Sequence, residues 1–156
     1  MPDGSAELSL SLHPRIAEIP AIEWDACAGA GNPFVSHAFL SALEDSGSAV
    51  AERGWLPQHA ALRDEAGRLV ACAPCYAKSH SQGEYVFDHG WADALERAGG
   101  DYYPKLQVCS PFSPVPGPRL LLRPGSGLPL AVLAGALEQA NAELGTSGVH
   151  ATFCTQ

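Results

Sequence analysis

Hydrophobic and polar residues alternate strictly over residues 7–13, so that Leu8, Leu10 and Leu12 share one face. This spacing predicts a strand that buries one of its two faces. Pro14 follows directly and ends the strand, because proline lacks the backbone N–H that a continuing strand ladder needs.

Four other segments place their apolar residues at the spacing of a helix. Pro20 suits the first turn of the first helix, and Ser36 and Asp88 are suited to cap the second and third. A glycine follows each of the last three segments and predicts where the helix stops. The predicted helices are residues 20–27, 38–46, 89–98 and 127–144.

The middle of the chain predicts an antiparallel meander. Residues 58–63 and 68–78 are two strands joined by a hairpin turn, and Pro74 marks a bulge in the second, which is apolar and central. Further strands are predicted at residues 83–87, 105–109, 119–122 and 149–153. The chain is therefore expected to be a single α/β (α+β) domain, residues 1–156, with a mixed, mostly antiparallel sheet flanked by helices.

Composition restricts the class of protein. The chain has 156 residues, of which 46% are hydrophobic and 17% charged, as in an ordinary globular domain. A net charge of −8 argues against general nucleic-acid binding, which depends on basic residues. There is no apolar run of about 18 residues, no secretory signal and an odd number of cysteines, so we expect no membrane span and a cytoplasmic location.

Glu84 and Asp88 are the carboxylates of interest in the middle segment. A strand at residues 83–87 would place them on one face but about 13 Å apart, too far for a glycosidase pair. One carboxylate beside a pocket can still act as a general base. The alternative interpretation makes Glu84 a solvated charge and Asp88 a helix cap.

The sequence does not predict a metal site. Six histidines lack H-x-x-x-H spacing, and Cys72 and Cys75 lie in a predicted strand, where residues three apart point to opposite faces. Those cysteines are expected to be buried and structural. The chain contains no Gly-rich phosphate loop and no serine-hydrolase elbow. Its aromatic residues Tyr102, Tyr103, Phe112 and Trp91 either line a groove or form a core under a long loop.

Several segments carry a resemblance to a known family: Asn32-Pro33-Phe34, Gly54-Trp55, the run from Lys78 to Asp88, Tyr103-Pro104-Lys105-Leu106-Gln107, and Pro116-Gly117-Pro118-Arg119. Over residues 32–153 the chain resembles a bacterial family of GNAT-like proteins related to the Fem-type peptidoglycan aminoacyltransferases. The resemblance implies a GNAT-like acyl-CoA N-acyltransferase fold. It also implies transfer of an acyl or aminoacyl group to an amine, with acyl-CoA (acetyl-CoA) or aminoacyl-tRNA as donor.

Members of this family are usually more than twice as long and have two such lobes. The resemblance therefore implies that this chain is the N-terminal lobe of a longer protein, inactive without its C-terminal lobe. On this interpretation Glu84 is the general base, and Asp88 and His89 are the next catalytic candidates. The side chains that would position a small-molecule or peptide amine are His80, Tyr85, Tyr103 and Lys105. The alternative is a non-catalytic recognition module for a peptidoglycan-like or amino-acid-like ligand.

Overall fold

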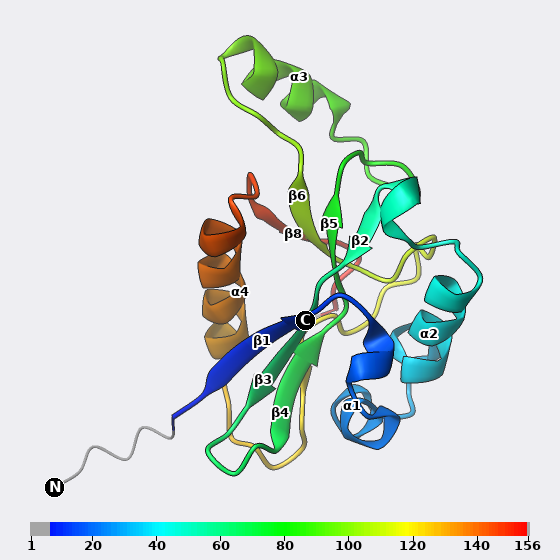
Figure 1. The fold of residues 1–156 in the computed structure, drawn as a ribbon, viewed down its shortest axis with the longest axis vertical. Helices are drawn as coiled ribbons and strands as arrows, with labels where there is room; N and C mark the ends of the chain where they lie inside the picture. The colour runs from blue at the N-terminus through cyan, green and yellow to red at the C-terminus, as the bar shows by residue number, and fades with distance from the viewer. Residues whose placement is uncertain (1–6, 156) are drawn as a thin grey trace, which may run out of the picture.

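Two four-stranded sheets and four α-helices make up the described part of the chain, residues 7–155 of a computed structural model (Figure 1). Sheet A has the order β1-β3-β4-β7, and sheet B has the order β2-β5-β6-β8. All strand pairs are antiparallel except β6 and β8, which are parallel and are connected through β7 of sheet A and then α4. The prediction of an α+β fold with mostly antiparallel pairing is confirmed, but there are two sheets instead of one.

The strands of sheet A are β1 (Ser9–His13), β3 (His59–Arg63), β4 (Leu69–Ala73) and β7 (Leu121–Leu122). Those of sheet B are β2 (Trp55–Pro57), β5 (Cys75–Lys78), β6 (Lys105–Val108) and β8 (Val149–Ala151). The helices are α1 (Ala21–Ala28), α2 (His37–Asp45), α3 (His89–Arg97) and α4 (Leu130–Leu144), with short 3-10 turns η1 (Ile16–Glu18), η2 (Pro33–Val35) and η3 (Ala51–Arg53).

One long hairpin runs through both sheets. Its first arm is β2 followed by β3, and its second arm is β4 followed by β5. The arms change sheet at Gln58 and Pro74, and Gln58 N–H donates to the Cys75 carbonyl at 2.8 Å across this junction. Pro74 therefore does not bulge a single strand but divides it, so that β4 pairs with β7 and β5 pairs with β6.

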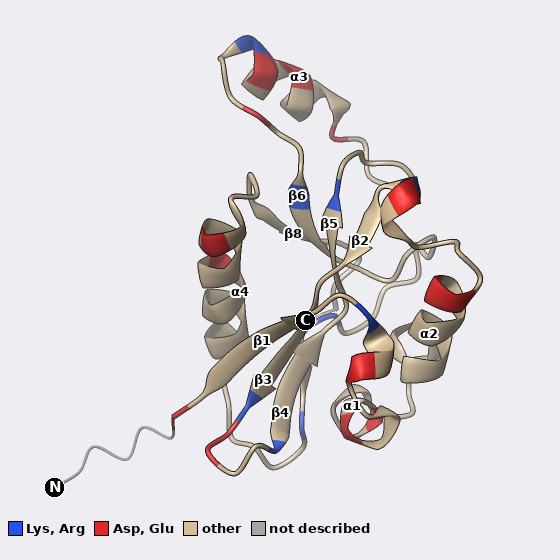
Figure 2. Ribbon diagram, in the orientation of Figure 1, with Lys and Arg blue, Asp and Glu red and all other residues tan. Residues whose placement is uncertain are grey.

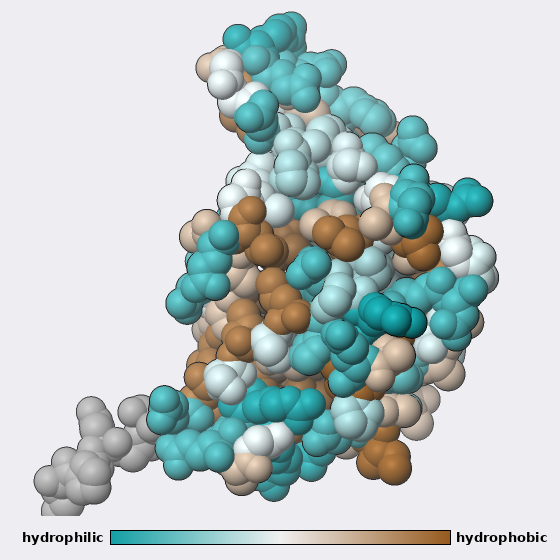
Figure 3. Space-filling view, viewed as in Figure 1, coloured by the Kyte–Doolittle hydropathy of each residue, from teal (hydrophilic) through white to brown (hydrophobic). Residues whose placement is uncertain are grey.

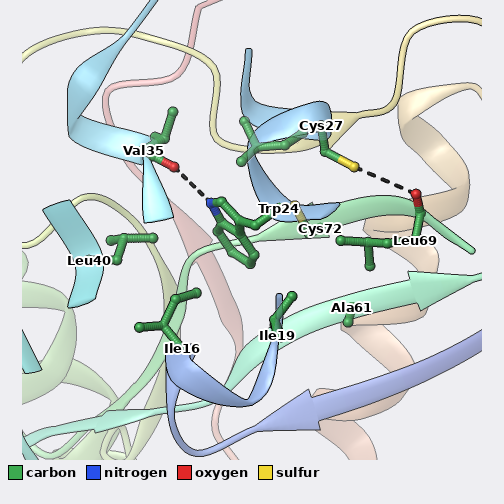
Figure 4. Close-up of a cluster of buried hydrophobic side chains, with 10 residues drawn as sticks. Ile16, Ile19, Trp24, Cys27, Val35, Leu40, Ala61, Leu69 and Cys72 are labelled. Atoms are coloured by element: carbon green, nitrogen blue, oxygen red, sulfur yellow. Dashed lines mark hydrogen bonds between the residues drawn. The ribbon is translucent and has the colours of Figure 1, made fainter. Parts of the chain in front are cut away.

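Two apolar clusters lie on opposite faces of sheet A. The first packs α1 and α2 against β3 and β4, around Trp24 (Figure 4). The second packs α4 against both sheets through Leu133 and Leu137. The hydroxyl of Ser36 accepts the Phe39 N–H at 3.2 Å and caps α2, as the sequence predicts.

The prediction of a strand at residues 83–87 is wrong. These residues belong to a loop between β5 and α3, in which Gly83 and Tyr85 have φ values of 78° and 57°. A strand cannot continue through such left-handed residues. Beyond this loop, α3 projects from the body of the molecule (Figure 1). No helix within residues 7–155 is long and apolar enough to cross a membrane.

Trp24 is the largest side chain of the first cluster, and its indole N–H donates to the Val35 carbonyl at 2.9 Å. We predict that Trp24→Phe lowers the free energy of unfolding by about 2–4 kcal/mol, because it leaves a cavity and an unpaired buried carbonyl. Urea unfolding measures the change. Ile22→Ala, on the same helix but 87% exposed, is the control and should change it by less than about 0.5 kcal/mol. Equal losses would contradict this account of the core.

Candidate functional site

Sheet B buries a polar face. The alternation of β5 and β6 places Lys78 opposite Lys105 and Tyr76 opposite Gln107, and all four side chains are fully buried. Figure 2 shows the two lysines as blue segments at neighbouring ends of β5 and β6, below α3. Buried lysines are rare unless they have partners, so the groups that cover this face decide its chemistry.

Lys105 is the centre of this buried cluster. Its Nζ lies 2.8 Å from an oxygen of Asp88, 3.1 Å from an oxygen of Glu84 and 2.9 Å from the Ser81 hydroxyl. All three partners come from the loop between β5 and α3. One ammonium therefore holds this loop against the end of sheet B through charge-assisted contacts.

Asp88 lies at the start of α3, but its side chain does not cap the helix. One carboxylate oxygen instead accepts from Lys105 and from the Tyr102 hydroxyl, at 2.8 and 2.7 Å. Burial by itself would raise the pKa of Asp88, but these hydrogen bonds outweigh burial and hold the pKa well below its ordinary value. The predicted side-chain cap is therefore replaced by an ion pair. A strand at residues 83–87 predicted about 13 Å between Glu84 and Asp88. That prediction is wrong, because both carboxylates contact the same nitrogen, Nζ of Lys105.

Glu84 is the most unusual group of the cluster. Its carboxylate is fully buried, and neither oxygen has a hydrogen-bond partner among the described residues, although Oε1 lies 3.1 Å from the Lys105 ammonium. Burial raises the pKa of Glu84, and the charge of Lys105 offsets only part of that shift. A buried carboxylate with free lone pairs needs an explanation, and one explanation is a catalytic role.

Lys78 sits beside this cluster without a carboxylate contact of its own. Its Nζ lies 3.3 Å from the centre of the Trp55 ring and donates to the Gln82 carbonyl at 3.1 Å. Burial lowers the pKa of Lys78 to about 8, although the charge of Glu84 acts in the opposite direction. The ring and one carbonyl are weaker partners for an ammonium than a carboxylate is.

Only some of the sequence-predicted site residues come together here. Glu84, Asp88 and Lys105 meet directly, and Tyr103 joins them through a 2.6 Å hydrogen bond to Ser81. His80 lies outside the cluster. Its Nε2 pairs with the Arg53 carbonyl at 2.8 Å and its Nδ1 with the Gln82 N–H at 3.0 Å.

Tyr85, in the loop, and His89, the first residue of α3, are both exposed and lie outside the buried cluster. Two residues at or beside the cluster, Lys78 and Ser81, received no role from the sequence. Tyr102 was predicted to line a groove or to form a core under a long loop, and its hydroxyl instead donates to Asp88. Lys78 lies at the end of a strand that is predicted to be apolar and central. A lysine at such a position was a sequence signal for a buried charge.

A polar cavity of about 490 Å³ adjoins the cluster. His80, Gln82 and Gly83 line it together with the rings of Trp55 and Phe112, whose centres are 5.1 Å apart. Trp55 and Gln82 also contact Lys78, so they separate the cavity from the buried charges. Of the four aromatic residues predicted to line a groove, only Phe112 does so at this cavity.

A second cavity of about 360 Å³ shares three lining residues with the first: Ala51, Gly54 and Ser79. Its other walls are mostly apolar and include Leu56 and Leu144. Figure 3 shows apolar atoms gathered between α4 and the strands on this face. The two cavities thus provide a polar and an apolar compartment side by side, which suits an elongated ligand that has both kinds of group.

The cysteines of the C-x-x-C pattern are free and buried, as expected. Cys72 belongs to sheet A and Cys75 to sheet B, with Pro74 between them. Within residues 7–155, no group of three or more His, Cys, Asp or Glu side chains is placed to hold a metal ion.

A family model described as peptidoglycan biosynthesis/recognition matches residues 15–156, nearly the whole chain. The chain belongs to the FemAB-like family. No curated protein and no solved structure matches it significantly. Membership of the FemAB-like family makes a peptidoglycan-related function the general assignment, and the predicted family resemblance is confirmed.

Lys78 provides a test of the buried polar face of this FemAB-like chain. Because the pKa of Lys78 is about 8 when folded and 10.5 as a free side chain, the unfolded chain binds more protons between these pH values. Lys78 should therefore make the free energy of unfolding rise with pH in this window, by up to about 1.4 kcal/mol per pH unit. Lys78→Met should remove this component.

Urea unfolding of the wild type and Lys78→Met at several values between pH 8 and 10 measures the effect. The difference in stability between the two proteins should grow with pH in favour of the wild type. A pH-independent difference would mean that Lys78 titrates as an exposed lysine, contrary to its fully buried position.

Proposed function

We propose that this chain is the acceptor-binding lobe of a Fem-type N-acyltransferase, which transfers an acyl or aminoacyl group to an amine of a cell-wall peptide. Membership of the FemAB-like family supports the biological context. The observation that carries the catalytic part is the buried carboxylate of Glu84. Its Oε1 lies 3.1 Å from the Lys105 ammonium, and neither oxygen has a hydrogen-bond partner within the described part of the chain.

In the proposed reaction Glu84 takes a proton from the ammonium of the acceptor. The freed lone pair attacks the acyl carbonyl, an amide bond forms, and the thiol or hydroxyl of the donor departs with a proton. Burial raises the pKa of Glu84, which makes its carboxylate a stronger base than an exposed glutamate. Lys105 and Asp88 keep Glu84 at the end of sheet B.

The proposed acceptor site is the polar cavity lined by His80, Gln82 and Phe112. Gln82 and Gly83 line this cavity and Glu84, the next residue, does not, so the proposal requires residues 82–83 to move aside while Lys105 keeps hold of Glu84. Tyr103 and Lys105 position the reacting groups from within the cluster. Tyr85 and His89 are exposed and are not among the residues that line this cavity, so their predicted roles, in substrate binding for Tyr85 and in catalysis for His89, rest on the family resemblance.

The remaining parts of the proposal rest on the family resemblance. They are a GNAT-like fold, a cytoplasmic location, a donor that is acetyl-CoA or aminoacyl-tRNA, and a second lobe that completes the enzyme. The parallel pair of β6 and β8 within otherwise antiparallel sheets is compatible with such a fold. Within the described residues β8 has a strand neighbour on one side only, which leaves an edge where a second lobe could pair.

A second candidate function is recognition of a cell-wall peptide without catalysis. The observation that favours it is the complete burial of Glu84, since a binding module needs the cavity but not the carboxylate. In that case the cluster around Lys105 only shapes the loop that forms one wall of the cavity.

Glu84→Gln in the full-length protein separates these functions. We expect the rate of acyl transfer to a muropeptide, from acetyl-CoA or aminoacyl-tRNA, to fall by roughly 10²–10⁴-fold because the general base is lost. Binding of the muropeptide, measured by calorimetry, should change little because the glutamine keeps the shape of the side chain.

Glu96→Gln, at an exposed position on α3, is the matched control and should leave transfer unchanged. An unchanged rate in Glu84→Gln would remove Glu84 from the mechanism. Muropeptide binding without turnover of either donor would support the recognition module instead.

A further inference from the structure

The apolar cavity of about 360 Å³ lies beside β2, β5 and the end of α4. Leu56 and Ala77, which are partners in the pairing of β2 with β5, line it together with Leu144, the last residue of α4. Leu56 and Leu144 are 40% and 45% exposed. A ligand can therefore reach this cavity from solvent without any displacement of the chain.

The apolar cavity meets the polar cavity at Gly54 and Ser79, which line both. Gly54 has a φ of 80°, and a Cβ at this position would collide with the His80 ring and the Ser79 hydroxyl. Only glycine fits there, so the two cavities meet over backbone that carries no side chain. Ser79 is exposed, and its hydroxyl faces this junction, where it can donate a hydrogen bond to a carbonyl group of a ligand.

The two cavities have different chemistry on either side of this junction. In the polar cavity, Glu52, Arg53 and Gln82 offer charged and hydrogen-bonding groups. The apolar cavity has room for up to about 12 methylene groups, if each occupies roughly the 30 Å³ of a water molecule in the liquid. On the same basis it fits a straight aliphatic chain of about eight to twelve carbons, and an acetyl group would leave most of it empty.

We propose that the acyl group of the proposed transfer is an aliphatic chain of roughly eight to twelve carbons, which lies in the apolar cavity while the acylated amine lies in the polar cavity. This inference rests on the proposed function and specifies its donor, whose acyl chain is uncharged and longer than an acetyl group. The carbonyl of the acyl group then lies at the junction beside the Ser79 hydroxyl. The product, an N-acylated amine, spans both cavities over Gly54.

Calorimetry of the full-length protein with N-acylglycines, the simplest models of an acylated peptide amine, tests the proposal without any need for turnover. We expect the affinity to rise roughly fourfold for each methylene added between about six and ten carbons, because each methylene that enters the cavity is removed from water. The rise should end near about twelve carbons, where the cavity is full. An affinity that does not depend on chain length would overturn the proposal.

Variants locate the chain. Leu144→Asn removes an apolar wall and should weaken the binding of N-decanoylglycine several-fold. Leu130→Asn is the matched control, because Leu130 is 51% exposed at the opposite end of α4 and lines neither cavity. Ala77→Phe fills the cavity and should end the rise at shorter chains, and urea unfolding shows whether this variant is folded. Ser79→Ala should weaken the binding of every chain length by the same factor.

A rise with chain length that Leu144→Asn leaves unchanged would place the chain elsewhere on the surface and overturn the proposal, as would equal losses in Leu144→Asn and Leu130→Asn. Acyl transfer that depends on Glu84, without stronger binding of longer N-acylglycines, would keep the proposed function and reject only this inference. Binding that increases with chain length, in a protein whose Glu84→Gln variant transfers normally, would support the acyl-chain site and reject only the role of Glu84.

Discussion

The contact of the Lys105 ammonium with Glu84 and Asp88 is the interaction on which the functional part of this structure depends. It joins β6 to the loop between β5 and α3, and it does so where both carboxylates and the lysine are largely removed from water. Burying three charges is unfavourable unless they compensate one another. The loop is therefore fixed in one position by a requirement for charge balance more than by apolar packing.

The bent hairpin makes this arrangement possible. Because Pro74 divides the second arm, the chain leaves sheet A after β4. The next strand, β5, pairs with β6 in sheet B, and this pairing places Lys78 beside Lys105. Sheet A and the two apolar clusters on its faces form a conventional core. Sheet B instead buries lysine, tyrosine and glutamine side chains on one face. Stability and chemistry are thus located mainly in different sheets of the same small domain.

Local rules predicted much of this fold from the sequence. The alternation of Leu8, Leu10 and Leu12 and the capping residue Ser36 depend only on neighbouring residues, and both correspond to the observed elements. The run from Glu84 to Asp88 also alternates, but the left-handed backbone at Gly83 and Tyr85 turns it into a loop. The partners of Lys105 lie 17 to 24 residues away in sequence, so no local pattern could assign them. For that reason the candidate residues were partly predictable, but their contacts were not.

Hydrogen exchange of Lys105→Met tests the central claim most directly. Removing the ammonium leaves the buried carboxylates of Glu84 and Asp88 uncompensated. The account predicts faster amide exchange across residues 79–104, while β3 and β4 keep the protection of the wild type. Unchanged exchange in residues 79–104, or an equal increase over the whole chain, would contradict the claim that Lys105 holds this loop.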